Sequence, residues 1–274
     1  MAIRLTHYSD LKLEGLLPRD VWVWVPPAYQ ENPKDRFPVI YIHDGQNLFF
    51  PEKSYTGVTW GVVETITKLS GWGFIQPAIV VGIDNTENRP GDYLPTRPFT
   101  TPEGQAFIAS LPEAARAKFD KFDFISDQYL KLMVEVVKPT VDRDFRTLPD
   151  LAHTIVMGSS MGGLISLYAL VEYPSVFGRA GCLSIHWPMV EMVILPYLNN
   201  HLPEPGQHKL YFDYGSEGVD ALYAPCQAKV DEIGLSRGYV MGRDWLTRFA
   251  PGADHHESAW RNRLHIPLRF FLGR

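Results

Sequence analysis

A serine flanked by glycines is the residue of this chain best suited to chemistry. Residues 158–162 read Gly-Ser-Ser-Met-Gly, which places Ser160 at the centre of a G-x-S-x-G pattern. A mostly apolar run at 154–157 precedes this pattern, and a helix-capable run at 164–172 follows it. A nucleophile on a sharp strand-to-helix turn needs small neighbours, because larger side chains would clash there. The pattern predicts Ser160 as a nucleophile; the plainer interpretation is a glycine-rich turn with a buried serine.

Histidines near the end of the chain could supply the general base that a serine nucleophile needs. His255 and His256 follow the last predicted strand, in a turn that opens a helix. Two adjacent residues cannot both point at the same serine, so one of them is a bystander. His186 follows an earlier strand, and we expect it to line the pocket rather than to act as the base.

A carboxylate that orients the histidine would complete such a site. Asp213, Glu217 and Asp220 lie at the end of a predicted strand or in the turn after it. Asp213 lies within the strand and could serve the structure. Glu217 and Asp220 lie where an orienting acid belongs, although Glu217 could be a solvated turn residue and Asp220 a helix N-cap. The order serine, acid, histidine is that of the α/β-hydrolases.

Two backbone N–H groups would have to stabilise the negative charge that develops on the substrate oxygen. One belongs to the residue after the nucleophile, which is Met161. The other is expected in the loop after an earlier strand, where residues 43–47 read His-Asp-Gly-Gln-Asn. Gly45 lets the backbone come close, and the N–H of Gln46 is the predicted second donor.

The elements that position these residues alternate between strands and helices. Continuous apolar runs indicate strands buried on both faces, and stripes at helical spacing indicate the helices between them. This alternation predicts an α/β fold with a mostly parallel central sheet covered by helices on both faces. The expected strands lie within 3–16, 21–25, 37–43, 77–83, 154–157, 179–184, 209–214 and 244–249, and the expected helices at 60–70, 127–141, 164–172, 189–199, 221–234 and after 255.

One long segment interrupts this rhythm. Residues 85–120 carry several prolines and polar residues, and a short charged helix is expected over 113–121. Excursions of this length in a compact domain often form a lid or a substrate wall, although an ordinary surface insertion is the alternative. We find no boundary of a second domain, so residues 1–274 are expected to form one domain with 85–120 as its insertion.

Composition excludes several classes of function. A net charge of −5 and a pI near 6.0 give no electrostatic basis for binding nucleic acid or an anionic membrane. Cys182 and Cys226 show no disulfide or metal-binding spacing and are expected to be reduced and packed. Neither a secretory leader nor a membrane-spanning stretch is evident. A cytoplasmic protein with a small-molecule substrate is expected, unless a leader has been removed.

With these residues placed, the sequence resembles the putative-esterase family of α/β-hydrolases, which includes feruloyl esterases, enterobactin esterases and the antigen 85 mycolyltransferases. Residues 41–49 resemble the family's loop with the second oxyanion donor, and Trp60 matches a tryptophan that follows it. Arg89 and residues 92–95 resemble an R-x-x-E-Y-x-P segment with Asp in place of Glu. The elbow matches closely, and residues 255–260 resemble an H-x-E-x-x-W ending.

The resemblance makes a choice among the candidate residues. It implies His255, the first histidine of the ending, as the base. For the acid, counting back from Gln227 in the following helix gives Asp220, whereas counting forward from Gly215 comes nearer to Glu217. We favour Asp220 and keep Glu217 as the alternative.

The family implies an ester hydrolase that works through an acyl-enzyme and needs no cofactor or metal. Typical substrates of the family are acylated sugars, phenolic acid esters and siderophore lactones, and we expect an acylated carbohydrate or a phenolic acid ester here. Trp187, Tyr93 and Trp60 could provide stacking surfaces for such a substrate. The alternatives are an acyltransferase or serine peptidase on the same scaffold, and a hydrolase-fold protein that binds without catalysis.

Overall fold

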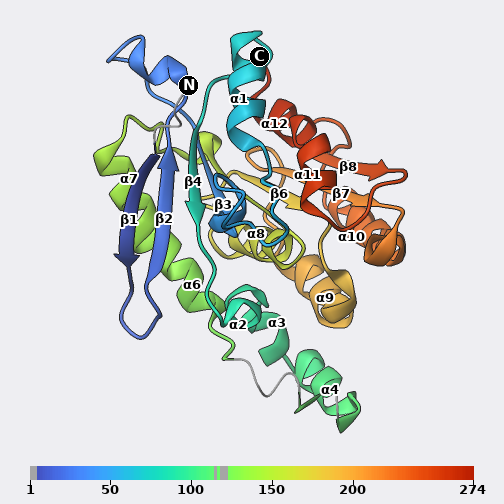
Figure 1. Ribbon diagram of the computed structural model, residues 1–274. Helices are drawn as coiled ribbons and strands as arrows, with labels where there is room; N and C mark the ends of the chain where they lie inside the picture. Colours follow the sequence, from blue (N-terminus) through green and yellow to red (C-terminus); the bar gives the residue numbers. More distant parts are fainter. Residues whose placement is uncertain (1–4, 114–115, 118–122) are drawn as a thin grey trace.

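The protein is built around one twisted sheet. A computed structural model describes residues 5–113, 116–117 and 123–274, and in this part of the chain eight strands form a sheet in the order β1-β2-β4-β3-β5-β6-β7-β8 (Figure 1). β2 is antiparallel to both of its neighbours, and all later neighbours are parallel, which confirms a mostly parallel α/β sheet. The strands are β1 (Leu5–Leu11), β2 (Arg19–Trp24), β3 (Val39–His43), β4 (Ile79–Ile83), β5 (Thr154–Ser159), β6 (Arg179–Leu183), β7 (Lys209–Gly215) and β8 (Trp245–Ala250).

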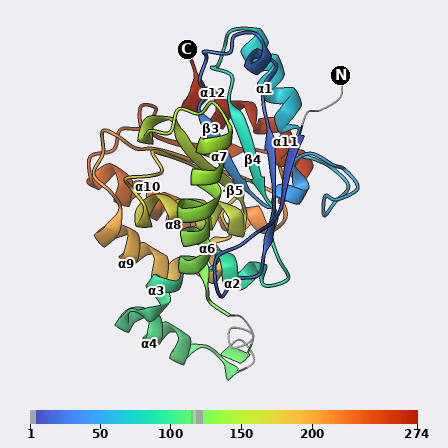
Figure 2. The same ribbon diagram turned by 90° about the vertical axis from the view of Figure 1, so that its left-hand side faces the viewer.

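Helices cover both faces of this sheet, as expected. One face packs against α1, α11 and α12, and the other packs against α6 to α10 (Figures 1 and 2). In the described residues no helix is long and apolar enough to cross a membrane. The helices are α1 (Val62–Gly71), α2 (Arg89–Tyr93), α3 (Thr96–Thr100), α4 (Pro102–Ser110), α6 (Ser126–Leu132), α7 (Lys138–Asp144), α8 (Met161–Glu172), α9 (Glu191–His201), α10 (Ala224–Ser236), α11 (Glu257–Arg263) and α12 (His265–Leu272).

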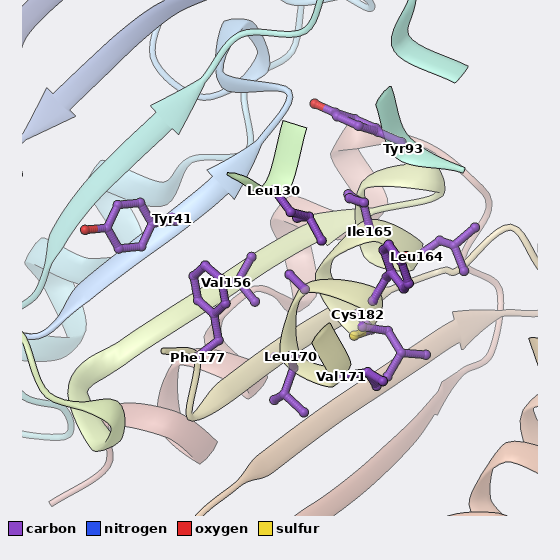
Figure 3. Close-up of a cluster of buried hydrophobic side chains, with 14 of the residues drawn as sticks. Tyr41, Tyr93, Leu130, Val156, Leu164, Ile165, Leu170, Val171, Phe177 and Cys182 are labelled. Carbon is purple, nitrogen blue, oxygen red and sulfur yellow. The ribbon is translucent and has the colours of Figure 1, made fainter. Parts of the chain in front are cut away.

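Alternation along the central strands gives each face of the sheet its own core. In β3, Tyr41 packs into the cluster on the α8 side, whereas Ile40 and Ile42 pack into the cluster on the α1 side. Figure 3 shows Tyr41 beside Val156 and Phe177 in the cluster on the α8 side, to which Leu164 and Ile165 of α8 also belong. Because every residue of β3 and of β5 is buried, these strands read as continuous apolar runs in the sequence.

The helix predicted over 127–141 is longer than expected and is not uniform. α6 and α7 are joined by one π-helical turn, Met133–Val137, and α7 continues to Asp144 rather than ending near Pro139. The N–H of Lys138 donates to the carbonyl of Met133, five residues back. This wider turn lies directly before Pro139, whose missing N–H would otherwise break the helix.

The segment 85–113 leaves the sheet where β4 ends. It contains α2, α3 and α4, and in Figures 1 and 2 the last two extend away from the body of the molecule. The charged helix expected over 113–121 falls largely outside the described residues. Cys182 and Cys226 are buried free thiols, in agreement with the sequence.

Candidate active site

Ser160 occupies the turn between β5 and α8. Its backbone has φ 57° and ψ −123°, a conformation that residues with a side chain rarely adopt. The N–H of Ser160 donates to the carbonyl of Leu183 in the neighbouring strand, at 2.9 Å, which fixes the turn against the sheet. A strained strand-to-helix turn of this kind exposes the serine hydroxyl at the carboxyl edge of the sheet.

The glycines around Ser160 are required by space. A Cβ atom on Gly158 would lie 2.5 Å from backbone atoms of Gly162, closer than such atoms approach in proteins. A Cβ atom on Gly163 would lie 3.1 Å from the carbonyl oxygen of Leu183. The G-x-S-x-G pattern therefore reflects the close approach of β5, α8 and β6 at this turn.

His255 is hydrogen-bonded to a buried carboxylate. Its Nδ1 lies 2.6 Å from Oδ1 of Asp220, whose side chain is fully buried. Burial by itself would raise the pKa of Asp220, but hydrogen bonds from His255, Ser184 and the N–H of Gly215 lower it below its ordinary value. Asp220 is thus held as a carboxylate, and it fixes the orientation of the His255 ring.

The structure separates the two carboxylates between which the sequence left the choice open. Glu217 is exposed and accepts a hydrogen bond from the hydroxyl of Ser216, not from a histidine. Asp220 lies inside a short 3₁₀ helix, Gly218–Leu222, and does not cap α10; the residue at that position is Tyr223, which makes no side-chain capping bond. The geometry favours Asp220 as the partner of His255.

A second layer of polar residues supports Asp220. The hydroxyl of Ser184 donates to Oδ2 of Asp220 at 2.6 Å. The same hydroxyl accepts from Trp260 Nε1 at 3.1 Å and from Arg263 Nη2 at 2.7 Å. Arg263 also donates to the carboxylate of Asp213, 3.0 Å away, which gives Asp213 the structural role expected for it. Because Ser184 uses its donor and both acceptor positions, its orientation is fixed.

The other two candidate histidines are held in different ways. Nδ1 of His256 accepts from the N–H of Ser258 at 3.1 Å and so caps α11, which makes His256 the bystander of the adjacent pair. His186 is partly exposed, and its Nδ1 lies 2.9 Å from the hydroxyl of Tyr223. Burial, followed by the nearby His255, lowers the pKa of His186, so this ring is neutral at ordinary pH.

Both predicted oxyanion donors lie at the start of a helix. Gln46 belongs to a short 3₁₀ helix, Gly45–Asn47, directly after β3, and Met161 is the first residue of α8. The first N–H groups of a helix have no partner within that helix. A Cβ atom on Gly45 would lie 2.6 Å from the backbone of β4, so only glycine fits there.

Ser160 and His255 line the same cleft, which has a volume of about 470 Å³. Small-molecule sites generally fall in the range of roughly 300–1,000 Å³. Gln46, Lys53 and Arg89 also line this cleft. The remaining lining residues are Asp44, Asn47, Tyr55, Thr56, Asn85, Ser159, His256, Glu257 and Trp260. His186, which was expected to line the pocket, is not among the residues that line this cleft.

The aromatic residues expected to stack on a substrate lie elsewhere. Trp60, Tyr93 and Trp187 are at most 1% exposed, and none of them lines the cleft. The hydroxyl of Tyr93 instead accepts from the N–H of Asp44. The prediction that these three rings stack on a substrate is therefore wrong. The sequence could not distinguish aromatic residues of the core from aromatic residues that bind a substrate, because both are of the same types.

Several residues that the fold brings to the site were not predicted from the sequence. Ser184, Tyr223 and Arg263 carried no recognisable pattern, and their relation to Asp220 depends on the packing of distant elements. Asp44 and Arg89 did stand in motifs quoted above, but their pairing spans 45 positions and is not visible from spacing.

His43 is a fully buried histidine at the end of β3, next to the loop of Gln46. Its side chain is fully buried, and Nδ1 lies 2.7 Å from the hydroxyl of Tyr129. Nε2 is buried with no hydrogen-bond partner among the described residues. Burial lowers the pKa of His43 from 6.5 to about 3, so the ring is neutral in the folded protein at ordinary pH.

Fold and site together define an α/β-hydrolase fold with a serine on a strained strand-to-helix turn. The model of the family described as "Putative esterase" matches residues 17–270. The chain therefore belongs to the putative esterase family, which confirms the resemblance read from the motifs. This membership, with esterases among the similar proteins, supports the class of carboxylic ester hydrolases.

Two curated proteins of Bacillus subtilis are similar in sequence. The ferri-bacillibactin esterase BesA is 28% identical over 162 residues, which cover 57% of this chain and 50% of BesA. The uncharacterised protein YbbA is 25% identical over 198 residues, or 71% of this chain and 67% of YbbA. The matched region thus spans half of one relative and two thirds of the other.

Solved structures share the fold at lower identity. An IroE-like serine hydrolase from Shewanella oneidensis superposes with a TM-score of 0.72 at 18% identity, covering 97% of this chain and 79% of that one. The enterobactin esterase FES from Shigella flexneri gives a TM-score of 0.67 at 19% identity, covering 98% of this chain and 59% of that one. At sequence identities this low, the similarity to these structures shows a shared fold alone.

The substitution Gly158→Ala should destabilise the protein. The added methyl group would overlap the backbone of Gly162, and overpacking of a core commonly costs about 1–3 kcal/mol. Gly71→Ala is the matched control, because a Cβ atom there would meet nothing within 4 Å. Urea unfolding of both variants measures the difference. Equal stability of the two would contradict the close approach at the elbow.

Stability should depend on pH through His43. The unfolded chain binds a proton at this residue below pH 6.5, whereas the folded protein does so only near pH 3, so acid favours unfolding throughout this window. When the pH falls from about 7 to about 5, protonation of His43 in the unfolded chain should lower the free energy of unfolding by about 2 kcal/mol. Denaturant unfolding of the wild type and His43→Asn at both pH values measures this. A variant that loses as much stability as the wild type would rule out the effect.

Proposed function

We propose that the protein is a serine carboxylic ester hydrolase that acts through an acyl-enzyme, with Ser160 as nucleophile, His255 as base and Asp220 as the acid that orients it. One observation carries the proposal: the strained Ser160 lines the same cleft as His255, and His255 is hydrogen-bonded to the buried Asp220. Family membership supports the reaction class.

In the first half of the proposed reaction, His255 Nε2 takes the proton of the Ser160 hydroxyl while the serine oxygen attacks the ester carbon. Negative charge then develops on the former carbonyl oxygen, and the N–H groups of Met161 and Gln46 stabilise it. When the intermediate collapses, the bond to the alcohol oxygen breaks. The protonated His255 gives its proton to the departing alcohol, which leaves the acyl group on Ser160.

In the second half, water replaces the alcohol. His255 removes a proton from the water as its oxygen attacks the acyl carbon, and the same two N–H groups stabilise the second oxyanion. Collapse breaks the bond to Ser160, which recovers the proton from His255. The carboxylic acid is released, and no cofactor or metal takes part in any of these steps.

For the substrate we propose a small acylated carbohydrate or a phenolic acid ester. A cleft of about 470 Å³ suits a small molecule, and Lys53 in its lining favours an acyl group or alcohol that carries strongly polar oxygens. Arg89 also lines the cleft, but its charge is paired with that of Asp44. BesA is, by its name, an esterase that acts on ferri-bacillibactin, which supports ester hydrolysis as the reaction. A cytoplasmic location and the absence of nucleic-acid partners stay predictions from composition.

Ser160→Ala should abolish turnover of short p-nitrophenyl esters. Loss of a serine nucleophile lowers kcat by on the order of 10⁵–10⁶-fold in well-developed sites. A fluorophosphonate should label the wild type at Ser160, as read by mass spectrometry of the peptide, and should not label the variant. Turnover that survives in Ser160→Ala would remove the nucleophile assignment. A wild type that neither turns over nor becomes labelled would favour a protein that only binds.

Asp220→Asn and Glu217→Gln should differ greatly in activity. Asp220→Asn removes the charge that orients and stabilises His255, and we expect kcat to fall by about 10³-fold or more. Glu217→Gln changes an exposed side chain and should leave kcat within about twofold. Steady-state kinetics on one ester compares the two. If Glu217→Gln proves to be the crippled variant, the choice of the acid is wrong.

A further inference from the structure

The loop with the predicted second oxyanion donor is held from outside by residues 85–93. Asp44, at the start of this loop, has φ 58° and ψ 49°, a left-handed conformation that is uncommon for a residue with a side chain. Its carboxylate accepts hydrogen bonds from both Nε and Nη2 of Arg89, each at 2.8 Å. Asn85 Nδ2 donates to the same carboxylate at 2.6 Å.

The same segment also holds the backbone and the next side chain of the loop. The N–H of Asp44 donates to the hydroxyl of Tyr93 at 3.1 Å. The N–H of Asn85 donates to Oε1 of Gln46 at 3.2 Å. Contacts to a carboxylate, a peptide N–H and an amide side chain together determine where the N–H of Gln46 points.

The segment is itself anchored in the body of the protein. Asp92 accepts from Arg19 at 2.8 Å, and both side chains are completely buried. Thr86 donates to the other oxygen of Asp92 at 2.9 Å. Within this segment, Asp92 therefore fixes α2 to the body of the protein. Arg89 and Tyr93 contact Asp44 in the loop.

The charge of Asp44 lies close to the nucleophile. A Cβ atom on Gly162, in the first turn of α8, would lie 3.3 Å from Oδ2 of Asp44, so the carboxylate packs against that turn. An unpaired carboxylate there would oppose the negative charge of the oxyanion. The ion pair with Arg89 cancels it: burial raises the pKa of Asp44, but the charge and hydrogen bonds of Arg89 bring it below its ordinary value.

We propose that Asp44 and Arg89 are positioning residues for the oxyanion hole. Asp44 fixes the loop that presents the N–H of Gln46, and Arg89 both holds Asp44 and cancels its charge beside Ser160. Residues 85–93 are thus a fixed clamp, whereas a lid formed by the rest of 85–120 stays a prediction. This inference rests on the proposed function for its effect on catalysis, but not for its effect on the loop.

Kinetics of three variants test the role of the charge. Arg89→Met leaves the buried carboxylate of Asp44 unpaired, and we expect kcat to fall by on the order of 10²-fold with a smaller change in KM. Adding Asp44→Asn removes that charge, and Asn tolerates the left-handed conformation, so the double variant should recover kcat by about tenfold. Arg143→Met, which breaks an exposed Arg–Asp pair far from the cleft, is the control and should keep wild-type kcat. A double variant no faster than Arg89→Met would overturn the role of the charge.

Hydrogen exchange followed by mass spectrometry tests the clamp without reference to activity. Arg89→Met should speed exchange at least tenfold in the peptide with residues 45–48, whose N–H groups of Asn47 and Leu48 bond within the loop. Exchange in α8 should stay unchanged in the same sample, and Arg143→Met should alter neither peptide. Unchanged exchange in 45–48 would overturn the clamp, whatever the kinetics. If the wild type hydrolyses no ester but this exchange rises, the clamp stands and the proposed function fails.

Discussion

The strained backbone of Ser160 is the constraint on which the rest of the structure depends. A backbone conformation with positive φ of this kind costs about 1–3 kcal/mol and persists only where its surroundings leave no alternative. Here β5 is buried along its whole length before the turn, and α8 is buried from Met161 to Val171 after it. Complete burial of one large apolar side chain contributes about 1.5–3 kcal/mol, so a few such residues of α8 offset the strain. Glycines at 158, 162 and 163 then let the turn close.

The register of the parallel strands aligns the residues that hold the turn of Ser160 and Asp220 in one row across the sheet. Ser159 in β5 is paired with Leu183 in β6, and Leu183 is paired with Asp213 in β7, so these three positions form one row across the sheet. The residues that follow the first two, Ser160 and Ser184, donate their N–H groups to the carbonyls of Leu183 and Asp213 in this row. Both serines also have positive φ. The proposed nucleophile and the hydroxyl that donates to the proposed acid therefore follow neighbouring strands at corresponding positions, with the same backbone hydrogen bond.

Local patterns made much of this predictable. The buried strands and the G-x-S-x-G turn are each encoded within a few consecutive residues, and so they could be found from the sequence. For the proposed acid the sequence favoured Asp220 but left Glu217 as the alternative, because the choice depends on how the turn after β7 folds against the last loop. The prediction that aromatic residues stack on the substrate was wrong for a related reason. Whether Trp60 or Trp187 is buried depends on packing and not on residue type. The Arg89 clamp stayed hidden because its partner is 45 positions away.

The distribution of charge around the cleft gives the proposed acid a distinct environment. Asp44 and Asp213 are each paired with a guanidinium, whose charge does not change at accessible pH. Asp220 is different: besides His255, it accepts from a neutral hydroxyl and a peptide N–H. Those neutral donors keep Asp220 ionised without cancelling its charge. Its negative charge therefore remains available to the imidazolium that forms on His255 in the proposed reaction, which a carboxylate already paired with arginine could not stabilise as well.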